Sequence, residues 1–225
     1  IVGIITAQDV VEAVDDEMGE DYAKLAGLTA EEDLQETTKQ SIKKRLPWLV
    51  VLLVLGMGVS AVVGAFENVV AILPIVICFQ SLILDMAGNV GTQSLAVTIR
   101  VLMDEELAPK DKLKLVLKEA KVGFSNGFLL GILAIVFLGL YIFLYKGYDI
   151  RHAFLISLCV GVSLLLAMIV SSLVGTLVPL FFKKIKVDPA VASGPLITTV
   201  NDLVAVVIYY GLSWVFLIQT MHILG

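Results

Sequence analysis

The sequence predicts an all-α, polytopic membrane protein with five transmembrane helices, preceded by a cytoplasmic amphipathic segment. Of its 225 residues, 58% are apolar and only 16% are charged, whereas soluble domains are nearer half apolar and a quarter charged. The charges are also unevenly placed, because residues 1–45 hold 16 of the 37 formal charges. Five later stretches are almost free of charge, and none alternates between apolar and polar residues as a membrane β-strand does.

Each of these five stretches is long enough to cross a bilayer, which takes about 20 apolar residues in a helix. The second, fourth and fifth exceed one straight crossing, so we expect tilt, a kink or an interfacial turn in each. The transmembrane domain is therefore predicted to cover residues 46–225. Its spans are residues 46–66, 68–99, 122–145, 153–182 and 189–224.

The basic residues predict the orientation of the chain. Fourteen Lys and Arg residues precede the first span or lie between spans two and three and between spans four and five, whereas only Lys146 and Arg151 lie on the other side. Cytoplasmic loops carry the excess of Lys and Arg in multi-pass proteins. The amino terminus is therefore expected in the cytoplasm and the carboxyl terminus outside.

The segment before the first span carries two helical patterns. Residues 1–7 form a β-branched run typical of a strand, and apolar residues at helical spacing follow over residues 8–16. This unit is too short to bury a core alone. Because the chain begins at Ile1 without a Met or the basic start of a signal peptide, we expect it to be part of a longer polypeptide.

A second amphipathic helix is predicted over Thr29–Arg45 within a connecting segment of residues 22–45. Thr29 and Glu32 have the spacing of a capping box. Acidic residues lie early and basic residues late, as the helix dipole favours. Pro47 is expected to open the first span as a first-turn proline.

Two carboxylates, Asp85 and Asp202, lie inside predicted spans. A carboxylate at bilayer depth costs roughly 2.5–3.5 kcal/mol, so it usually faces a partner or a water-filled path. Each could instead be a hydrogen-bonded residue that locks two helices together. At helical spacing Asp85 shares a face with Gly88, Asn89, Thr92 and Ala96, and Asp202 with Pro195, Thr198, Thr199 and Ala205. The glycines near Asp85 would permit close helix approach or, if the helix breaks, leave backbone carbonyls exposed.

The surroundings of Asp202 favour a hard cation. No intramembrane Lys or Arg is available to pair with it, so its partner is a proton or a mobile cation. Oxygen ligands suit Mg²⁺ or Ca²⁺, and Mg²⁺ retains several waters. No cluster of His, Cys and Met favours a soft metal. Five spans make a thin pore wall, so a symmetric homodimer with two copies of Asp202 facing one ion is expected.

Other functions are less compatible with the composition. The net charge of −5 and the lack of a basic stripe with aromatic residues exclude a nucleic-acid partner. Cys78 and Cys159 lie in apolar runs, which implies neither a disulfide nor a zinc site, and we expect both to pack as small buried residues.

Further acidic residues have two interpretations each. Glu67, at the outer end of the first span, is either an ordinary interfacial carboxylate or a pore-mouth residue that concentrates cations. An acidic cluster near the amino terminus is either a solvated helix face or a sensor of divalent cations. This cluster contains Asp9, Asp15, Asp16, Glu17, Glu20 and Asp21.

The two polar strings resemble the sequence signatures of the MgtE family of magnesium transporters. Gly88–Ser94 with Val97–Arg100 is similar to the second-span signature, and Asp188–Asp202 is similar to the fifth-span signature. Val2–Thr6 with Asp9 resembles the end of a CBS domain, so residues 1–21 are expected to be such a remnant. The resemblance covers nearly all of the chain.

The resemblance implies a homodimer in the bacterial inner membrane with an ion path at the dimer interface. Asp202 corresponds to the main Mg²⁺ selectivity residue, and backbone oxygens at Gly88 and Thr198 face the same ion. A plug helix, here Thr29–Arg45, would close the cytoplasmic end of the path when Mg²⁺ binds. Mg²⁺ would then be both the transported ion and a regulatory ligand. The resemblance therefore favours the interpretation of the acidic cluster as a sensor.

Combined with the residue patterns, the resemblance gives a full set of candidate site residues. Thr92, Gly194, Thr198 and Ala205 depart from residues that relatives carry, which leaves the discrimination among Mg²⁺, Mn²⁺, Co²⁺ and Ca²⁺ open. The candidate metal ligands are Asp202, Gly88, Thr198, Asn89, Thr92 and Asp85, and the candidate lining residues are Gly91, Gln93, Pro195, Thr199, Asn201 and Ala205.

The leading hypothesis is a Mg²⁺-selective channel or transporter that is not an enzyme. The sequence contains no P-loop, and the membrane potential could draw the ion inward. The alternatives are a proton-coupled exporter of divalent cations, an intramembrane aspartyl protease in which Asp85 and Asp202 share a proton, and a scaffold or receptor without transport.

Overall fold

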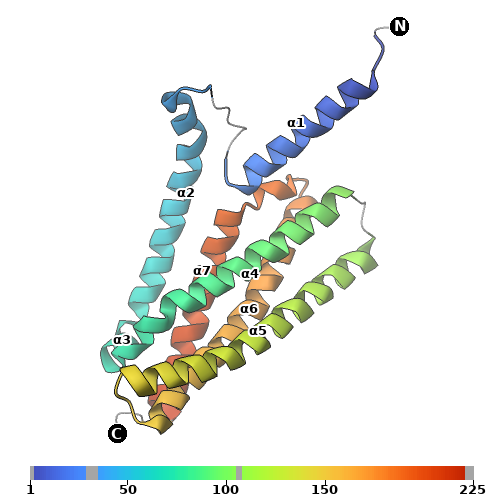
Figure 1. Ribbon diagram of the computed structural model, residues 1–225. Coiled ribbons are helices and arrows are strands. Elements are labelled where there is room, and N and C mark those ends of the chain that lie inside the picture. Colours follow the sequence, from blue (N-terminus) through green and yellow to red (C-terminus); the bar gives the residue numbers. More distant parts are fainter. Residues whose placement is uncertain (1–2, 29–34, 105–107, 221–225) are drawn as a thin grey trace.

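The computed structural model describes residues 3–28, 35–104 and 108–220, and every regular element in these ranges is a helix (Figure 1). Five stretches are long and apolar enough to cross a membrane, which confirms the predicted number of spans. The elements are α1 (Ala7–Leu25), α2 (Thr38–Ala65), α3 (Glu67–Ile72), η1 (Pro74–Val76), α4 (Ile77–Asp104), α5 (Pro109–Tyr145), α6 (Ile150–Lys184), η2 (Pro189–Val191), α7 (Gly194–Leu212) and the π-helical η3 (Ser213–Thr220).

The predicted strand at the start of the chain is not formed over residues 3–6, which have no regular structure. A strand needs a neighbouring strand for its backbone hydrogen bonds, and the described residues contain none. Helix α1 begins instead at Ala7, where Thr6 and Asp9 form a capping box. The helix continues to Leu25, well beyond the predicted residues 8–16.

The first span does not begin at Pro47. Helix α2 starts nine residues earlier at Thr38, and the Gln40 side chain accepts a hydrogen bond from the Thr37 backbone N–H (2.9 Å). It then runs through Pro47, which lies inside the helix and therefore leaves the Lys43 carbonyl without its usual N–H donor. The capping box expected at Thr29–Glu32 lies outside the described residues.

Turns shorten two of the three longest apolar runs, as expected. Pro74 separates the short α3 from α4, and η2 precedes α7, which passes into η3. The fourth run forms the continuous helix α6, with Pro179 inside its last two turns. The connections between α4 and α5 and between α6 and α7 lie at one end of the bundle, together with the start of α2 (Figure 1). We call this end, which carries most of the Lys and Arg residues, the basic end.

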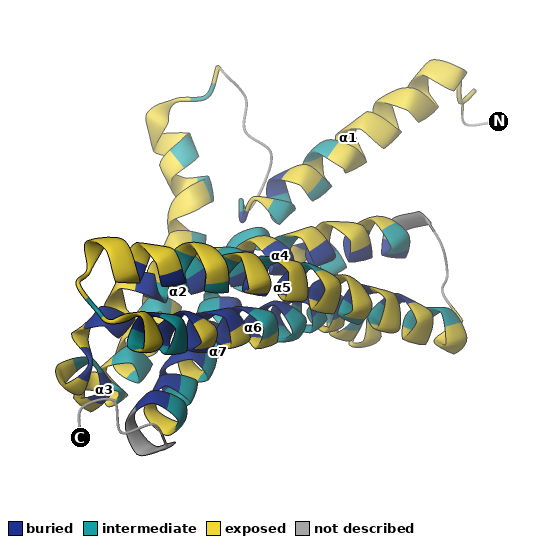
Figure 2. Cartoon of the chain, turned by 60° about the horizontal axis from the view of Figure 1, so that its bottom comes forward, coloured by how far each residue is buried: buried dark blue, intermediate teal, exposed yellow. Residues whose placement is uncertain are grey.

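Helices α4, α5, α6 and α7 form the bundle, whereas α2 stands beside it and packs mainly against α7 (Figure 1). No residue of α2 is buried. Helix α5 packs almost entirely against α6, so its opposite face is also exposed (Figure 2). The exposed faces of α2 and α5 are rich in large apolar side chains. Apolar surfaces of this size are stable only in contact with lipid or with another protein surface.

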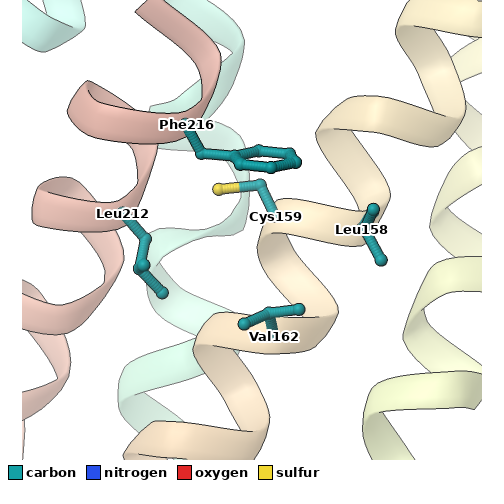
Figure 3. Close-up of a pocket in the computed structure, with 5 residues that line it drawn as sticks. All are labelled: Leu158, Cys159, Val162, Leu212 and Phe216. Atoms are coloured by element: carbon teal, nitrogen blue, oxygen red, sulfur yellow. The ribbon is translucent and has the colours of Figure 1, made fainter. Parts of the chain in front are cut away.

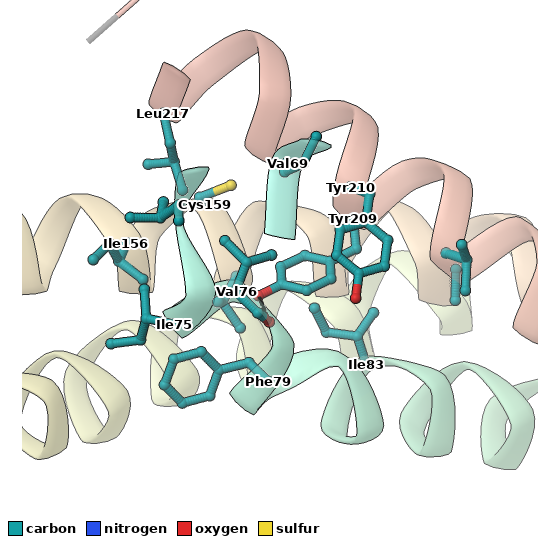
Figure 4. Packing of buried hydrophobic residues seen from close by; sticks show 14 of the residues in the cluster. Val69, Ile75, Val76, Phe79, Ile83, Ile156, Cys159, Tyr209, Tyr210 and Leu217 are labelled. Atoms are coloured by element: carbon teal, nitrogen blue, oxygen red, sulfur yellow. Dashed lines mark hydrogen bonds between the residues drawn. The ribbon is translucent and has the colours of Figure 1, made fainter. Parts of the chain in front are cut away.

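The largest buried cluster lies toward the end opposite the basic end, where α4, α6 and α7 meet (Figure 4). Tyr209 is fully enclosed, and its hydroxyl donates a hydrogen bond to the Val76 carbonyl (2.7 Å). The neighbouring Tyr210 donates to the Gln80 side chain (2.5 Å), and Phe66 stacks on its ring. These contacts fix α7 against the start of α4.

Small residues allow the helices to approach closely, as is common where lipid replaces water and apolar burial no longer drives association. Helix α5 buries Gly123, Gly127, Gly131 and Gly139, which face α6. Gly175 of α6 packs so tightly on α4 that a Cβ atom there would lie 2.2 Å from the Gly91 carbonyl oxygen. Because the obstructing atom is backbone, the helices themselves would have to move.

We therefore expect Gly175→Ala to lower the stability of the bundle by about 1–3 kcal/mol, the usual cost of overpacking. Gly64→Ala in α2 is the matched control, because a Cβ there meets no atom within 4 Å and the better helix propensity of alanine should be neutral or stabilising. Thermal unfolding in detergent, followed by circular dichroism, measures both. A melting temperature for Gly175→Ala equal to that of Gly64→Ala would contradict this packing.

Candidate site on the paired helices α4 and α7

Asp202 lies near the middle of α7 and is only partly buried in the single chain. Within the described part of the chain, no residue donates a hydrogen bond or forms an ion pair with it. Asp85 on α4 is exposed and likewise has no partner there. The alternative that these carboxylates lock helices together is therefore unsupported within one chain, and both remain available to a cation.

Asn201, the neighbour of Asp202, has a structural role. It is fully buried, and its Nδ2 group donates a long hydrogen bond to the Ala87 carbonyl of α4 (3.4 Å). Gly91 makes room for it, since a Cβ on Gly91 would lie 1.8 Å from Nδ2. Asn201 therefore lies at the contact between the helices rather than on a pore surface. Ala205, also predicted to line the pore, is fully buried in the main core cluster.

The threonines on the Asp202 face use their hydroxyl hydrogens within their own helix. Thr198 donates to the Gly194 carbonyl (3.0 Å) and Thr199 to the Pro195 carbonyl (2.9 Å). A hydroxyl that donates in this way still has oxygen lone pairs that can accept. The partly exposed face around Asp202 therefore offers acceptors, which suits a cation or the O–H groups of its bound waters.

Helix α4 is unbroken, so the alternative of carbonyls freed by the glycines is not realised. Gly88 is buried against Thr198, with 3.1 Å between the position of a Cβ and Cγ2 of Thr198. Its carbonyl accepts a hydrogen bond from the N–H four residues on, as in any helix, and the Thr92 hydroxyl lies within donating distance of the carbonyls of Gly88 (3.1 Å) and Asn89 (3.0 Å). The Gly88 oxygen that the resemblance assigns to the ion therefore already takes part in helix hydrogen bonding.

Several other predicted residues of α4 do reach the surface. Asn89 and Gln93 are exposed beside Asp85, and Thr92 is partly exposed. The polar string thus divides into an exposed amide and carboxylate face and a buried glycine face. Glu67, the predicted mouth residue, is exposed at the first position of α3.

The acidic residues of α1 do not form one metal site. Asp9 accepts hydrogen bonds from the Thr6 backbone and hydroxyl (both 2.7 Å), so its carboxylate caps the helix. Across the described ranges, no group of three or more His, Cys, Asp or Glu side chains is arranged to hold a metal. Asp21 alone is partly buried, whereas Asp15, Asp16, Glu17 and Glu20 are exposed.

The carboxyl end of α1 docks at the basic end of the α4–α7 pair. Lys24 forms an ion pair with Asp188 (2.8 Å), and Asp188 also caps η2 by accepting a hydrogen bond from the Ala190 N–H (2.9 Å). A Cβ on Gly194, the first residue of α7, would lie 3.4 Å from the Leu25 carbonyl oxygen and 3.7 Å from Cγ2 of Thr92. The end of α1 therefore lies beside the start of α7, next to α4.

Charge and burial oppose one another at this contact. Burial raises the pKa of Asp21 above its usual value, the nearby negative charge of Asp188 raises it further, and Lys24 partly offsets both. Burial also raises the pKa of Asp188, but the hydrogen bond from Lys24 and that from the Ala190 backbone outweigh it, so the net pKa is lowered. The same bond with Asp188 raises the pKa of Lys24.

The sequence interpretation missed this docking contact. The sequence pattern identifies Lys24 only as a charge flanking the first span, and Asp188 only as part of a family signature. The Asp188-Pro189 pair is a local signal, because an acidic residue before a first-turn proline is typical of a helix cap. No local pattern, however, pairs it with a residue 164 positions away.

The two cysteines differ from the expectation that both are buried. Cys78 is exposed at the start of α4, while Cys159 is buried. Cys159 lines a cavity of about 150 Å³ with Leu158, Val162, Leu212 and Phe216 (Figure 3). Its thiol lies 3.7 Å from the Ser213 hydroxyl. The remaining lining is apolar, so this cavity is not a cation site.

Comparison with known proteins adds independent information. Residues 80–212 match the family model MgtE, described as a divalent cation transporter. Proteins named magnesium transporter MgtE are 36% identical in Enterococcus faecalis and 35% identical in Bacillus subtilis, each over 96% of this chain. The protein of that name from Thermus thermophilus is 32% identical over 95% of the chain. In each case the chain spans 46% of the relative's length, about half of it.

We expect the charge of Lys24 to strengthen the docking of α1 and the charge of Asp21 to weaken it. In Mg²⁺-free buffer at pH 7, Lys24→Met should speed hydrogen exchange of the last turns of α1 by up to about fivefold, because a partly exposed ion pair contributes at most about 1 kcal/mol. Asp21→Asn should slow exchange there, because it removes a charge that burial and Asp188 disfavour. Asp16→Asn, an exposed change of equal charge, is the control.

The pH dependence follows from the same groups. The contribution of Asp188 is present above its usual pKa of 3.8 and is lost as the pH falls below it, because its folded pKa is lowered. The contribution of Lys24 is lost only at high pH, because its folded pKa is raised. Asp21 acts in the other sense and weakens docking as its carboxyl ionises. If Lys24→Met and Asp21→Asn shift exchange in the same direction, this charge balance is wrong.

Proposed function

Because this chain belongs to the MgtE family of divalent cation transporters, we propose that it forms the membrane-spanning part of a Mg²⁺-selective channel or transporter. In this proposal Mg²⁺ moves inward through a pore at the interface of a homodimer. The supporting observation is Asp202, a partly exposed carboxylate in the middle of a membrane-spanning helix, without a protein partner among the described residues.

The proposed ion is a hydrated Mg²⁺. A hydrated cation presents O–H donors, so its site needs acceptors more than donors. The Asp202 carboxylate and the lone pairs of Thr198 and Thr199 meet this need, since both threonine hydrogens are already used in the helix. One carboxylate and neutral oxygens cannot replace the whole hydration shell, and Mg²⁺ gives up its waters reluctantly. Asp85, Asn89 and Thr92 on α4 would contact the outer waters.

A second copy of the chain would complete the site. The single chain contributes one Asp202, and a symmetric dimer with its axis near α7 would place two copies around one ion. Helix α2 supports this arrangement, because none of its residues is buried and it packs mainly against α7. The free surfaces of α2 and α7 would then meet their counterparts in the partner.

The direction of transport follows from orientation and potential. With the basic end in the cytoplasm of a bacterial cell, the inner membrane potential draws cations toward it. A doubly charged ion gains about 4.6 kcal/mol per 100 mV, which is sufficient without nucleotide hydrolysis. Asp85 and Glu67 would lie nearer the outer end of this path than Asp202, and the exposed Glu67 would concentrate cations at its mouth.

The plug function is better assigned to α1 than to residues 29–45. Helix α1 ends against Gly194 and beside Thr92, at the basic end of the two helices that carry the proposed ligands. The negative charge of Asp188 is near enough to raise the pKa of Asp21, and a divalent cation between the two carboxylates would relieve this repulsion. In the proposal, cytoplasmic Mg²⁺ between them holds α1 in place and closes the path. Asp9, which caps α1, is left out of the sensor.

The test of transport is Mg²⁺ influx into liposomes that contain the purified chain and a Mg²⁺-sensitive dye. Under an inside-negative potential, Asp202→Asn should reduce influx at least tenfold, because the proposed ion loses its charged ligand. Asp85→Asn, the matched intramembrane control, should reduce influx less, because this carboxylate lies on the more exposed end of the path. Equal or greater loss with Asp85→Asn would reverse the assignment.

The same influx assay separates two of the alternatives, and a peptide-cleavage assay tests the third. Influx that stops when a pH gradient is removed would favour the proton-coupled exporter. Cleavage of a transmembrane peptide, lost with either aspartate variant, would favour the protease. No flux from the intact chain would favour a scaffold or receptor.

The gating proposal has a structural test that does not require flux. Addition of millimolar Mg²⁺ should slow hydrogen exchange at the end of α1 at least several-fold in the intact chain. Asp21→Asn should remove most of this response, because one of the two ligands is lost, whereas Asp16→Asn should preserve it. A full Mg²⁺ response in Asp21→Asn would show that the ion binds elsewhere.

A further inference from the structure

A shallow groove lies on the surface of α5 near the basic end, away from the proposed ion path. It has a volume of about 520 Å³, and six of its seven lining residues are exposed. Three lysines, Lys114, Lys118 and Lys121, line it together with Ser125 and Asn126. We call these five residues, with Leu117 and Val122 between them, the lysine groove.

Two of the three lysine charges in the groove have no counter-charge among the described residues. Lys114 pairs with Asp111 (2.8 Å). Lys118 and Lys121 form no ion pair with any residue in the described ranges, although both are exposed. Two uncompensated ammonium groups one helical turn apart attract an anion, and the neighbouring hydroxyl and amide can donate hydrogen bonds to its oxygens.

The position of the groove along α5 identifies the kind of anion. Lys121 is the last charged residue before residues 122–145, which contain no charge. The lysines therefore lie at the level of the lipid headgroups, with the hydrocarbon region directly adjacent. Phe124 and Phe128 follow Lys121 by three and seven residues, which places them on the same helical stripe as Lys121. They are about half exposed, and their ring centroids are 6.1 Å apart. A ligand here meets positive charge at one end and an apolar aromatic surface at the other.

We propose that the lysine groove binds an anionic phospholipid, with the phosphate between Lys118 and Lys121 and an acyl chain along Phe124 and Phe128. Charge complementarity favours anionic over zwitterionic headgroups, as for basic pockets on other membrane proteins. The exposed apolar face below the lysines favours a lipid over a free phosphate. Because α5 is at the edge of the bundle, the site is open to the bilayer without rearrangement (Figure 1).

The test is binding of dioleoylphosphatidylglycerol to the purified chain in detergent, measured by native mass spectrometry, with dioleoylphosphatidylcholine as the neutral comparison. The intact chain should retain phosphatidylglycerol preferentially. The double variant Lys118→Gln/Lys121→Gln should bind it about 25-fold more weakly, or about fivefold per lysine, which corresponds to about 1 kcal/mol for each lysine at an anionic surface. Both lysines are exposed, so the fold should be retained.

Two control variants make the result specific. Lys110→Gln/Lys112→Gln removes the same charge from the same helix outside the groove and should change binding less than twofold. Lys118→Arg/Lys121→Arg keeps the charge and should retain the lipid, which also controls for folding. Equal binding of the two lipids by the intact chain, or equal loss in both glutamine variants, would overturn the proposal.

Free glycerol 3-phosphate distinguishes a lipid site from a general anion site. At a concentration equal to that of the lipid it should not displace phosphatidylglycerol, because it lacks the acyl chains that contact Phe124 and Phe128. Displacement at equal concentration would overturn the assignment to a lipid. Since these measurements do not involve ion flux, they stand or fall independently of the proposed transport.

Discussion

The close contact of α4, α6 and α7 around Gly91 determines how the rest of the structure is arranged. Gly91 packs against Gly175 on one side and against Asn201 on the other. A Cβ atom on either glycine would overlap these neighbours. In lipid, where apolar burial does not drive helices together, such contacts supply much of the association. Because Asn201 points into this contact, Asp202, one residue further round the helix, is directed toward the partly exposed face of α7.

This arrangement explains how one carboxylate can remain partly accessible in a membrane helix. The polar groups next to it have separate roles. Asn201 and Gly91 hold the helices together, whereas the threonines satisfy their hydroxyl hydrogens locally and leave acceptors on the surface. A binding surface made only of acceptors is selective by charge, since it favours cations and their hydration shells over anions.

The two ends of the bundle differ in the forces that hold them. Away from the basic end, buried tyrosines and apolar side chains fix α7 against α4. At the basic end, α1 is held by a partly exposed ion pair and a few close contacts. Such an element opens at a much lower free energy than the core, and its attachment responds to the charges of Asp21 and Asp188. This contrast is suited to a movable closing element on a rigid membrane domain.

The sequence by itself determined the helical class and the five spans and located the two intramembrane carboxylates, because hydrophobic length and isolated charges are local properties of the chain. It also indicated that the second, fourth and fifth apolar runs exceed one straight crossing, but not where their turns lie. It could not show that Pro47 lies within a helix, that the initial strand lacks a partner, or that Asn201 and Ala205 are buried. Nor could it pair Lys24 with Asp188. These features depend on which helix faces lie against one another, and close approach at residues such as Gly91 and Gly175 decides that only when the whole bundle is assembled.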